Sequence, residues 1–267
     1  MEMKFEHNSF SKRLRSMLKV DFRRMFTMRL FYIMAGICLV MPILILVMTT
    51  MMDGSVTVDP QTGAETVIEG FDNTWQIIGS ASGESSSAGM SMTSMCNINL
   101  LYFFAAVLVC LFVSEDFKSG YAKNLFTVRS KKSDYVISKT LVGFVCGAFM
   151  LLAFFVGTML GGAISGLSFD MGTAGTGGIV MCMLAKMFLI AVFVPIYLAV
   201  SVAAKQKTWL SIVGSFCIGM LLFMMVPMMT PLDSGIMNVI LCLAGGVLFS
   251  AGLGVVSNTI LRKTSLV

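Results

Sequence analysis

Six long apolar stretches constrain this chain more than any other feature of its sequence. A helix needs about 20 apolar residues to cross about 30 Å of hydrocarbon. The stretches that meet this requirement are residues 30–52, 96–114, 140–164, 178–203, 208–230 and 235–261. Hydrophobic residues make up 57% of the chain and charged residues only 12%, which excludes an ordinary soluble domain. The sequence therefore predicts an all-α membrane protein with six transmembrane helices.

Lysine and arginine fall almost entirely on one side of this six-span chain. Of the 19 basic residues, 18 lie before the first stretch, between the second and third, between the fourth and fifth, or after the last. The outer loop 53–95 holds six acidic residues and no base. Because basic residues concentrate in cytoplasmic loops, both termini are predicted to lie in the cytoplasm. The net charge of +5 thus indicates topology, and nucleic acid is not expected as a partner.

The segment before the first stretch, residues 1–29, is predicted to contain a basic amphipathic helix. Apolar residues recur at helical spacing among basic residues, at Phe10, Leu14, Met17, Leu18, Phe22, Met25 and Phe26. Such a helix suits the inner membrane interface, against anionic headgroups. It serves either as a topology anchor or as an elbow that also contacts a cytoplasmic partner. Residues 30–267 then form the six-helix transmembrane domain.

The outer loop and the small residues of the stretches suggest further local structure. Residues 54–70 alternate apolar and polar side chains around turn residues, which is typical of a short hairpin, whereas 79–89 has the composition of a flexible linker. Close helix contacts are predicted by small residues at every fourth position, at Gly157 and Gly161 and at Gly246, Ser250 and Gly254. These contacts lie either within one subunit or between two.

Residues that could carry chemistry are scarce in the apolar stretches. Lys186 is the one ionisable residue within a stretch, and either snorkelling to the outer interface or a contact on the substrate path explains it. No carboxylate lies deep in a stretch, which argues against an ion-coupled carrier. The chain has one histidine, His7, and no P-loop motif, so it is not expected to be an enzyme.

Sulfur-bearing residues give no firm indication of a metal site. The seven cysteines are scattered and form no C-x-x-C pair. A soft-metal cluster near the outer face would involve Met90, Met92, Met95 and Cys96. Since the chain has 25 methionines, such a cluster also arises from composition alone, and metal binding there stays an open alternative.

The hydrophilic segment 115–139 between the second and third stretches is predicted to be an ordered cytoplasmic helix. Phe117, Tyr121, Leu125 and Val128 follow one helical face, and most charged residues lie off it. This aromatic stripe either packs on the ends of the chain's own spans or enters a groove on a soluble partner.

At this segment the chain resembles a known family. The run FVSEDFKSGYAKNLFTVRSKKSDYVISKTLVGF is similar to the segment between the second and third helices of ABC-2-type permeases. The likeness extends over the whole layout of basic interface helix, six spans and inside termini. The resemblance implies a permease subunit in a bacterial plasma membrane, paired with a second permease as a homodimer or heterodimer and with two copies of a separate ABC ATP-binding subunit. The permease itself would bind no cofactor, because ATP and Mg²⁺ would be held by the partner.

The resemblance also implies a contact surface and a substrate class. The second-to-third segment would be the coupling helix that contacts the ATP-binding subunit, through Glu115, Asp116, Phe117, Gly120, Tyr121, Asn124 and Leu125. Lys205 and Lys207 would form a secondary contact. The members most similar in style export amphipathic or antimicrobial peptides, including those of lantibiotic-immunity systems, and drugs, lipids or ions are the other candidates. The outer loop 53–95 is longer than in compact members, which leaves the substrate open.

Two function classes compete with an ATP-driven exporter. A non-transporting membrane scaffold or assembly protein would share the six spans but would need no ordered cytoplasmic helix with an aromatic face. An ion-coupled secondary transporter would need the membrane carboxylates that the sequence lacks.

Overall fold

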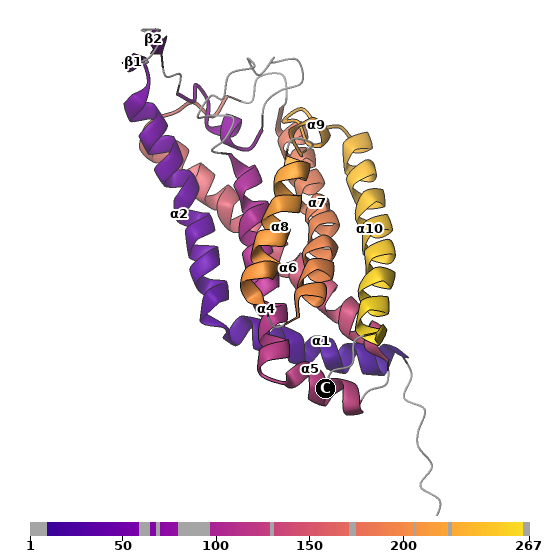
Figure 1. The fold of residues 1–267 in the computed structure, drawn as a ribbon. Coiled ribbons are helices and arrows are strands. Elements are labelled where there is room, and N and C mark those ends of the chain that lie inside the picture. Colours follow the sequence, from indigo (N-terminus) through magenta and orange to yellow (C-terminus); the bar gives the residue numbers. More distant parts are fainter. Residues whose placement is uncertain are drawn as a thin grey trace, which may run out of the picture.

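A computed structural model describes residues 10–58, 65–67, 70–79, 97–128, 131–170, 175–205, 207–223 and 226–263. Within these residues the chain is almost entirely helical, as predicted (Figure 1). The long helices are α2 (Arg29–Met52), α4 (Leu101–Lys118), α6 (Lys132–Ser165), α7 (Gly175–Ala204), α8 (Thr208–Phe223) and α10 (Ile236–Lys263). The shorter helices are α1 (Phe10–Thr27), α5 (Tyr121–Val128), α9 (Val226–Met229), η1 (Thr74–Ile77) and η2 (Ile98–Leu100).

Five helices are long and apolar enough to cross a membrane. They are α2, α4 together with the preceding η2, α6, α7 and α10, and they coincide with five of the six predicted stretches. The remaining stretch, 208–230, which is the fifth along the chain, is divided between α8 and the short α9. At 1.5 Å per residue, the 16 residues of α8 span about 24 Å, which is less than a typical hydrocarbon core of about 30 Å.

Successive long helices run in opposite directions through one bundle (Figure 1). The amphipathic α1 lies crosswise beneath the bundle, at the end where α5 is also found. The hairpin of β1 (Val56–Val58) and β2 (Glu65–Val67) lies at the opposite end. The hairpin expected in 54–70 is therefore present, and its two strands pair antiparallel. These two ends are called the α5 end and the hairpin end below.

The hairpin end is covered in part by the segment that follows the hairpin. Trp75, in η1, is buried and donates a hydrogen bond from its indole Nε1 to the carbonyl oxygen of Phe169, at 3.2 Å. The Thr74 amide likewise donates to the carbonyl oxygen of Ser168, at 3.1 Å. The outer loop is thus anchored to the chain just beyond α6.

The amphipathic α1 packs on the bundle with one face and exposes the other. Met17, Asp21 and Met25 are spaced four residues apart and are buried, which places them on one helical face. The opposite face is basic, with exposed residues at Lys12, Arg15, Lys19 and Arg23. Much of the apolar stripe predicted to lie against the inner membrane interface therefore contacts the protein itself.

Glycines set the closest contact between α2 and α6. A Cβ atom on Gly157 would overlap the backbone carbonyl oxygen of Leu39, and one on Gly161 would lie 2.9 Å from the Cα of Ile43. These contacts lie at Pro42, inside α2. The predicted G-x-x-x-G pair therefore packs within one subunit.

The pattern of small residues in α10 also serves packing within the chain. A Cβ atom on Gly246 would lie 2.9 Å from the Cβ of Ala191, in α7. Ser250 donates a hydrogen bond to the carbonyl oxygen of Ala191, at 3.2 Å. A second G-x-x-x-G pair, Gly143 and Gly147, was not singled out in the sequence, yet it brings α6 against α7.

Candidate functional site

The connection between α4 and α6 is broken where the sequence predicts one helix. α4 ends at Lys118, and Gly120 has a φ of 73°, in the left-handed region that non-glycine residues seldom adopt. α5 then begins at Tyr121 in a new direction, and α6 begins at Lys132. The prediction of a continuous helix over 115–139 was therefore wrong, because Ser119 and Gly120 end α4 with a glycine-containing turn.

The predicted contact residues are divided between exposed and buried positions. Glu115 and Asn124 are exposed, and Gly120, Tyr121 and Leu125 are half-buried. Asp116 and Phe117 are buried, with 0% and 7% of their surface accessible. For Phe117, the structure favours the alternative in which the aromatic stripe packs on the chain's own helices. The exposed residues of α5 and the last turn of α4 remain available to a partner.

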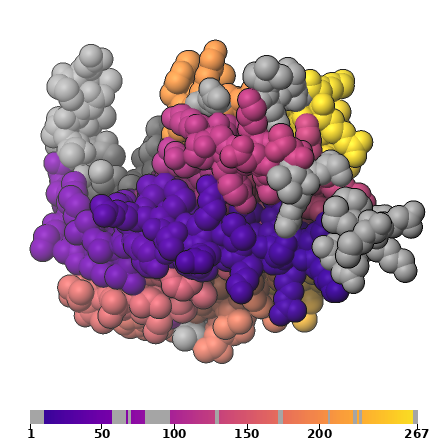
Figure 2. Space-filling view, turned by 90° about the horizontal axis from the view of Figure 1, so that it is seen from below, coloured from indigo at the N-terminus to yellow at the C-terminus, as the bar shows by residue number. Residues whose placement is uncertain are grey.

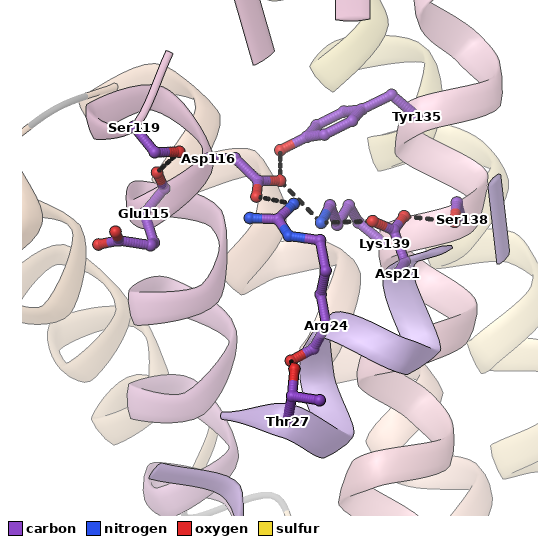
Figure 3. Close-up of polar contacts among 9 residues, drawn as sticks. All are labelled: Asp21, Arg24, Thr27, Glu115, Asp116, Ser119, Tyr135, Ser138 and Lys139. Atoms are coloured by element: carbon purple, nitrogen blue, oxygen red, sulfur yellow. Dashed lines mark hydrogen bonds and ion pairs between the residues drawn. The ribbon is translucent and has the colours of Figure 1, made fainter. Parts of the chain in front are cut away.

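A buried cluster of charged side chains joins α1, α4 and α6 near the end of α4 (Figure 3). The Lys139 ammonium lies 2.9 Å from Asp21 Oδ1 and 2.7 Å from Asp116 Oδ2. The Arg24 guanidinium lies 2.6 Å from Asp116 Oδ1. Two acids and two bases therefore balance one another at the meeting point of three helices. This set of Asp21, Arg24, Asp116 and Lys139 is called the charge cluster below.

Neutral groups complete the coordination of the charge cluster. The Tyr135 hydroxyl donates to Asp116 Oδ2 at 2.9 Å, and the Ser138 hydroxyl donates to Asp21 Oδ2 at 2.6 Å. The Lys139 ammonium also lies 3.6 Å from the centre of the Phe112 ring, close enough for a cation–π contact. Burying a charge is costly unless it is paired and hydrogen-bonded, and here each carboxylate has both kinds of partner.

Arg24 connects the charge cluster to α5. Its guanidinium lies over the Tyr121 ring, 4.0 Å from the ring centre, and also forms the ion pair with Asp116. Burial by itself would lower the pKa of Arg24, but the negative charge of Asp116 and its hydrogen bond outweigh burial and raise that pKa. Burial raises the pKa of the Tyr121 phenol. Arg24 is therefore charged and Tyr121 neutral at physiological pH, the states that favour a cation–π contact.

Two further contacts fasten the α5 end. Arg13 Nε, in α1, lies 3.1 Å from Asp134 Oδ2 near the start of α6. Lys132 Nζ donates to the carbonyl oxygen of Leu261 in the last turn of α10, at 2.7 Å. Figure 2 shows the result from below, with α1 lying across this face and the magenta segment that includes α5 beside it.

Most of the charge cluster was missed when the sequence was interpreted. Only Asp116 was named as a contact residue, and it was expected to face a partner. A signal for Asp21 was nevertheless present, because it is an acid on the apolar face of a basic helix, midway between Met17 and Met25. Nothing in the sequence indicated its pairing with Lys139, which is 118 positions away.

The predicted secondary contact lies in the tight turn between α7 and α8. Lys205 and Lys207 are both exposed, and Lys205 has a φ of 55°. Lys207 donates its amide hydrogen to the carbonyl oxygen of Ala204, at 3.1 Å. Both side chains therefore lie where a partner could reach them.

Lys186 is deep in the protein and does not snorkel. Only 1% of its surface is accessible, and its ammonium donates hydrogen bonds to Thr230 Oγ1 at 2.9 Å and to Asn99 Oδ1 at 3.4 Å. The snorkelling interpretation was wrong, because the ammonium finds these polar partners inside the bundle.

The described residues contain no group of three or more His, Cys, Asp or Glu that could hold a metal ion. The candidate soft-metal residues Met90, Met92, Met95 and Cys96 lie outside the described residues.

Comparison with known proteins identifies the family. The sequence model of the ABC-2 family transporter proteins matches residues 17–225, which is more than half of the chain. No curated protein and no solved structure matches it. The match covers α1 from Met17 onward, the charge cluster, α5 and the helices through α8, and it confirms the resemblance found at the connection between α4 and α6. The chain therefore belongs to the ABC-2 transporter family, as a multi-pass membrane subunit of the kind that pairs with an ABC ATP-binding subunit.

Proposed function

We propose that this chain is the permease of an ATP-driven exporter and that its α5 end contacts the ATP-binding subunit. The observation that carries this proposal is the attachment of α5. Through Arg24 and the charge cluster, α5 is connected to α1, α4 and α6 by buried ion pairs and a cation–π contact. Flexible linkers would absorb a displacement of α5, whereas this arrangement passes it to two long helices.

The contact surface consists of the exposed residues on and beside α5. These are Glu115, Lys118, Lys123, Asn124 and Thr127. Of the residues proposed from the family resemblance, Glu115 and Asn124 contact the partner directly, and Gly120, Tyr121 and Leu125 do so with their accessible parts. Asp116 and Phe117 act from inside, by holding the end of α4 in place. Lys205 and Lys207 extend the surface.

The assembly follows the family pattern of two permeases and two ATP-binding subunits in a bacterial plasma membrane. ATP and Mg²⁺ belong to the partner, and this chain binds neither. All six apolar stretches cross the membrane, with α8 and α9 together forming the fifth crossing. The α5 end and both termini face the cytoplasm, in agreement with the positions of 18 of the 19 basic residues. The basic face of α1 then lies at the cytoplasmic surface, where it can contact anionic headgroups.

The proposed substrates are amphipathic or antimicrobial peptides. A cationic peptide that leaves toward the acidic outer loop would be favoured electrostatically. Replacing Asp59, Glu65 and Glu69 by their amides should therefore reduce export of a cationic peptide more than export of a neutral one. Equal export of both peptides by the variant would show that the charge of the outer loop plays no part in export.

Co-purification tests the proposed pairing. The tagged chain, expressed with the genes that flank it and extracted in mild detergent, should bring down an ATP-binding subunit in stoichiometric amount. The double variant Lys118→Glu and Lys123→Glu should lose that subunit, because it reverses two exposed charges at the proposed contact. The matched control is Arg262→Glu with Lys263→Glu, which reverses two exposed charges at the end of α10 and should retain the subunit. Equal retention in both double variants would contradict the assigned surface, and the absence of any ATP-binding subunit would contradict the function.

A further inference from the structure

Lys186 joins three separate segments near the hairpin end. It lies on α7, whereas Asn99 lies in η2, just before α4, and Thr230 follows α9. The Thr230 hydroxyl donates its own hydrogen to the carbonyl oxygen of Val226, at 2.9 Å, so its lone pairs are free to accept from Lys186. One ammonium therefore links η2, α7 and the residue that follows α9. The line of contact between these three segments is called the seam below.

Neighbouring contacts strengthen the same seam. The Tyr102 hydroxyl, in α4, donates to the backbone carbonyl oxygen of Lys186, at 3.2 Å. The Cys182 thiol, one turn earlier in α7, contacts the carbonyl oxygen of Thr230, at 3.6 Å. The first bond joins α4, which follows η2, to α7, and the second joins α7 to the residue that follows α9.

The chemistry at Lys186 differs from that of the charge cluster. Lys139 is paired with two carboxylates, whereas the side-chain partners of Lys186 in the described part of the chain are a hydroxyl and an amide. A buried ammonium with neutral partners is poorly compensated, while a buried ion-pair network is difficult to break. Hydrogen bonds from an ammonium to a hydroxyl and an amide can break and form again within a transport cycle, because water can replace both groups as acceptors.

We propose that Lys186, Asn99 and Thr230 form a latch that holds the hairpin end of the bundle closed and must release for that end to open. This inference rests on the proposed function, since it assigns the latch to the outer side of a transport path. When the seam opens, water solvates the ammonium, and the charge that was poorly compensated in the closed state favours the open one. The closed and open states are thereby kept close in free energy.

A thiol near the latch provides the test. Cys182 is buried and lies four residues before Lys186 in α7. The full chain, with its other six cysteines replaced by alanine, is purified in detergent and treated with a charged, water-soluble methanethiosulfonate. Asn99→Leu and Thr230→Val should each raise the rate of Cys182 modification at least about tenfold, because each variant takes one acceptor from the buried ammonium, and tenfold corresponds to the loss of about one hydrogen bond. Thr259→Val is the matched control, because this threonine of α10 is exposed and makes the same kind of bond to the carbonyl oxygen four residues earlier, and it should leave the rate unchanged.

A second reporter separates local opening from general unfolding. Cys146 is buried on α6, a helix that contributes none of the three latch residues, and as the single cysteine it should stay slow to react in both latch variants. An unchanged rate at Cys182 in either folded variant would overturn the latch. Equal acceleration at Cys146 and Cys182 would also overturn it, because the effect would then be global. If Asn99→Leu fails to fold, Thr230→Val decides alone, since it removes only one hydroxyl. No ATP-binding subunit is present in this assay, so its result is independent of the co-purification.

Discussion

At the scale of single residues, the Asp116 side chain connects three helices at the α5 end. Its carboxylate is fully buried and contacts Arg24 in α1 together with Tyr135 and Lys139 in α6. One side chain of α4 thus holds two other helices. The neighbouring Glu115 points away from this cluster and is exposed (Figure 3). Adjacent acids in one helical turn therefore have separate roles, one internal and one at the surface.

This difference gives a paired prediction. Asp116→Asn should lower the free energy of unfolding by about 3–5 kcal/mol, because it leaves two bases, Arg24 and Lys139, with Asp21 as the single acid of the cluster. Glu115→Gln should change it by less than about 0.5 kcal/mol, as is usual for an exposed side chain. Thermal unfolding of the two variants in the same detergent makes the comparison. Equal melting temperatures would show that the buried ion pairs do not hold the α5 end together.

The sequence predicts individual residues of the site better than their pairing. The apolar stripe of α1 and its surrounding bases are evident at helical spacing, and Asp21 is conspicuous as an acid on that stripe. Which base it meets depends on how α1 crosses the bundle, and helical periodicity does not contain that information. Burial of Asp116 was missed for the same reason, since an acid at the end of an apolar helix is usually solvated.

At the scale of helices, glycine contacts decide how closely the long helices approach. Gly157 lies against the backbone of α2, whereas Gly36, in α2 itself, has nothing within 4 Å of the place where a Cβ would be added. Both positions are inside apolar helices. They differ only in what surrounds them, which makes them a matched pair.

Gly157→Ala should therefore destabilise the protein by about 1–3 kcal/mol or more, because the added methyl group meets backbone that cannot rotate away. Gly36→Ala should be neutral or stabilising by up to about 1 kcal/mol, since alanine favours helix over glycine. Both values follow from unfolding in detergent. A Gly157→Ala variant as stable as Gly36→Ala would contradict the close contact between α2 and α6.

The turn between α4 and α5 gives a further prediction. Gly120 has a positive φ and open space around it, so conformation rather than crowding limits what can replace it. Gly120→Val should displace α5 and reduce the amount of ATP-binding subunit that co-purifies, because a β-branched residue strongly disfavours this conformation. Gly120→Asn should retain most of the pairing, because asparagine tolerates the left-handed region. Loss of pairing to the same extent in both variants would indicate a requirement for glycine itself and contradict the conformational explanation.

Helix positions were largely predictable, and the departures have physical causes. Length and hydropathy located α2, α4, α6, α7 and α10, because a membrane span requires about 20 apolar residues. α6 begins eight residues before the predicted stretch, since Tyr135, Ser138 and Lys139 are helical and buried although they are polar. The stretch 208–230 was predicted as one helix, but the structure divides it into α8 and α9.

At the scale of the whole molecule, the two ends of the bundle are closed by different chemistry. The α5 end is fastened by ion pairs among α1, α4 and α6, and the hairpin end by hydrogen bonds around Lys186. Between them, glycine contacts hold α2 against α6 and α7 against α10. A displacement of α5 can therefore reach the hairpin end through α4, which carries Asp116 near one end and at the other follows η2, the short helix that contains Asn99.

The central claim is that an ATP-binding subunit covers the exposed face of α5. The most direct test introduces one cysteine into a cysteine-free chain, either as Lys123→Cys in α5 or as Lys263→Cys at the end of α10. Both positions are exposed, and the rate of thiol modification is compared with and without the ATP-binding subunit. The account predicts that Lys123→Cys becomes strongly protected in the complex while Lys263→Cys keeps its rate. Equal rates at Lys123→Cys with and without the subunit, in a complex that still hydrolyses ATP, would contradict it.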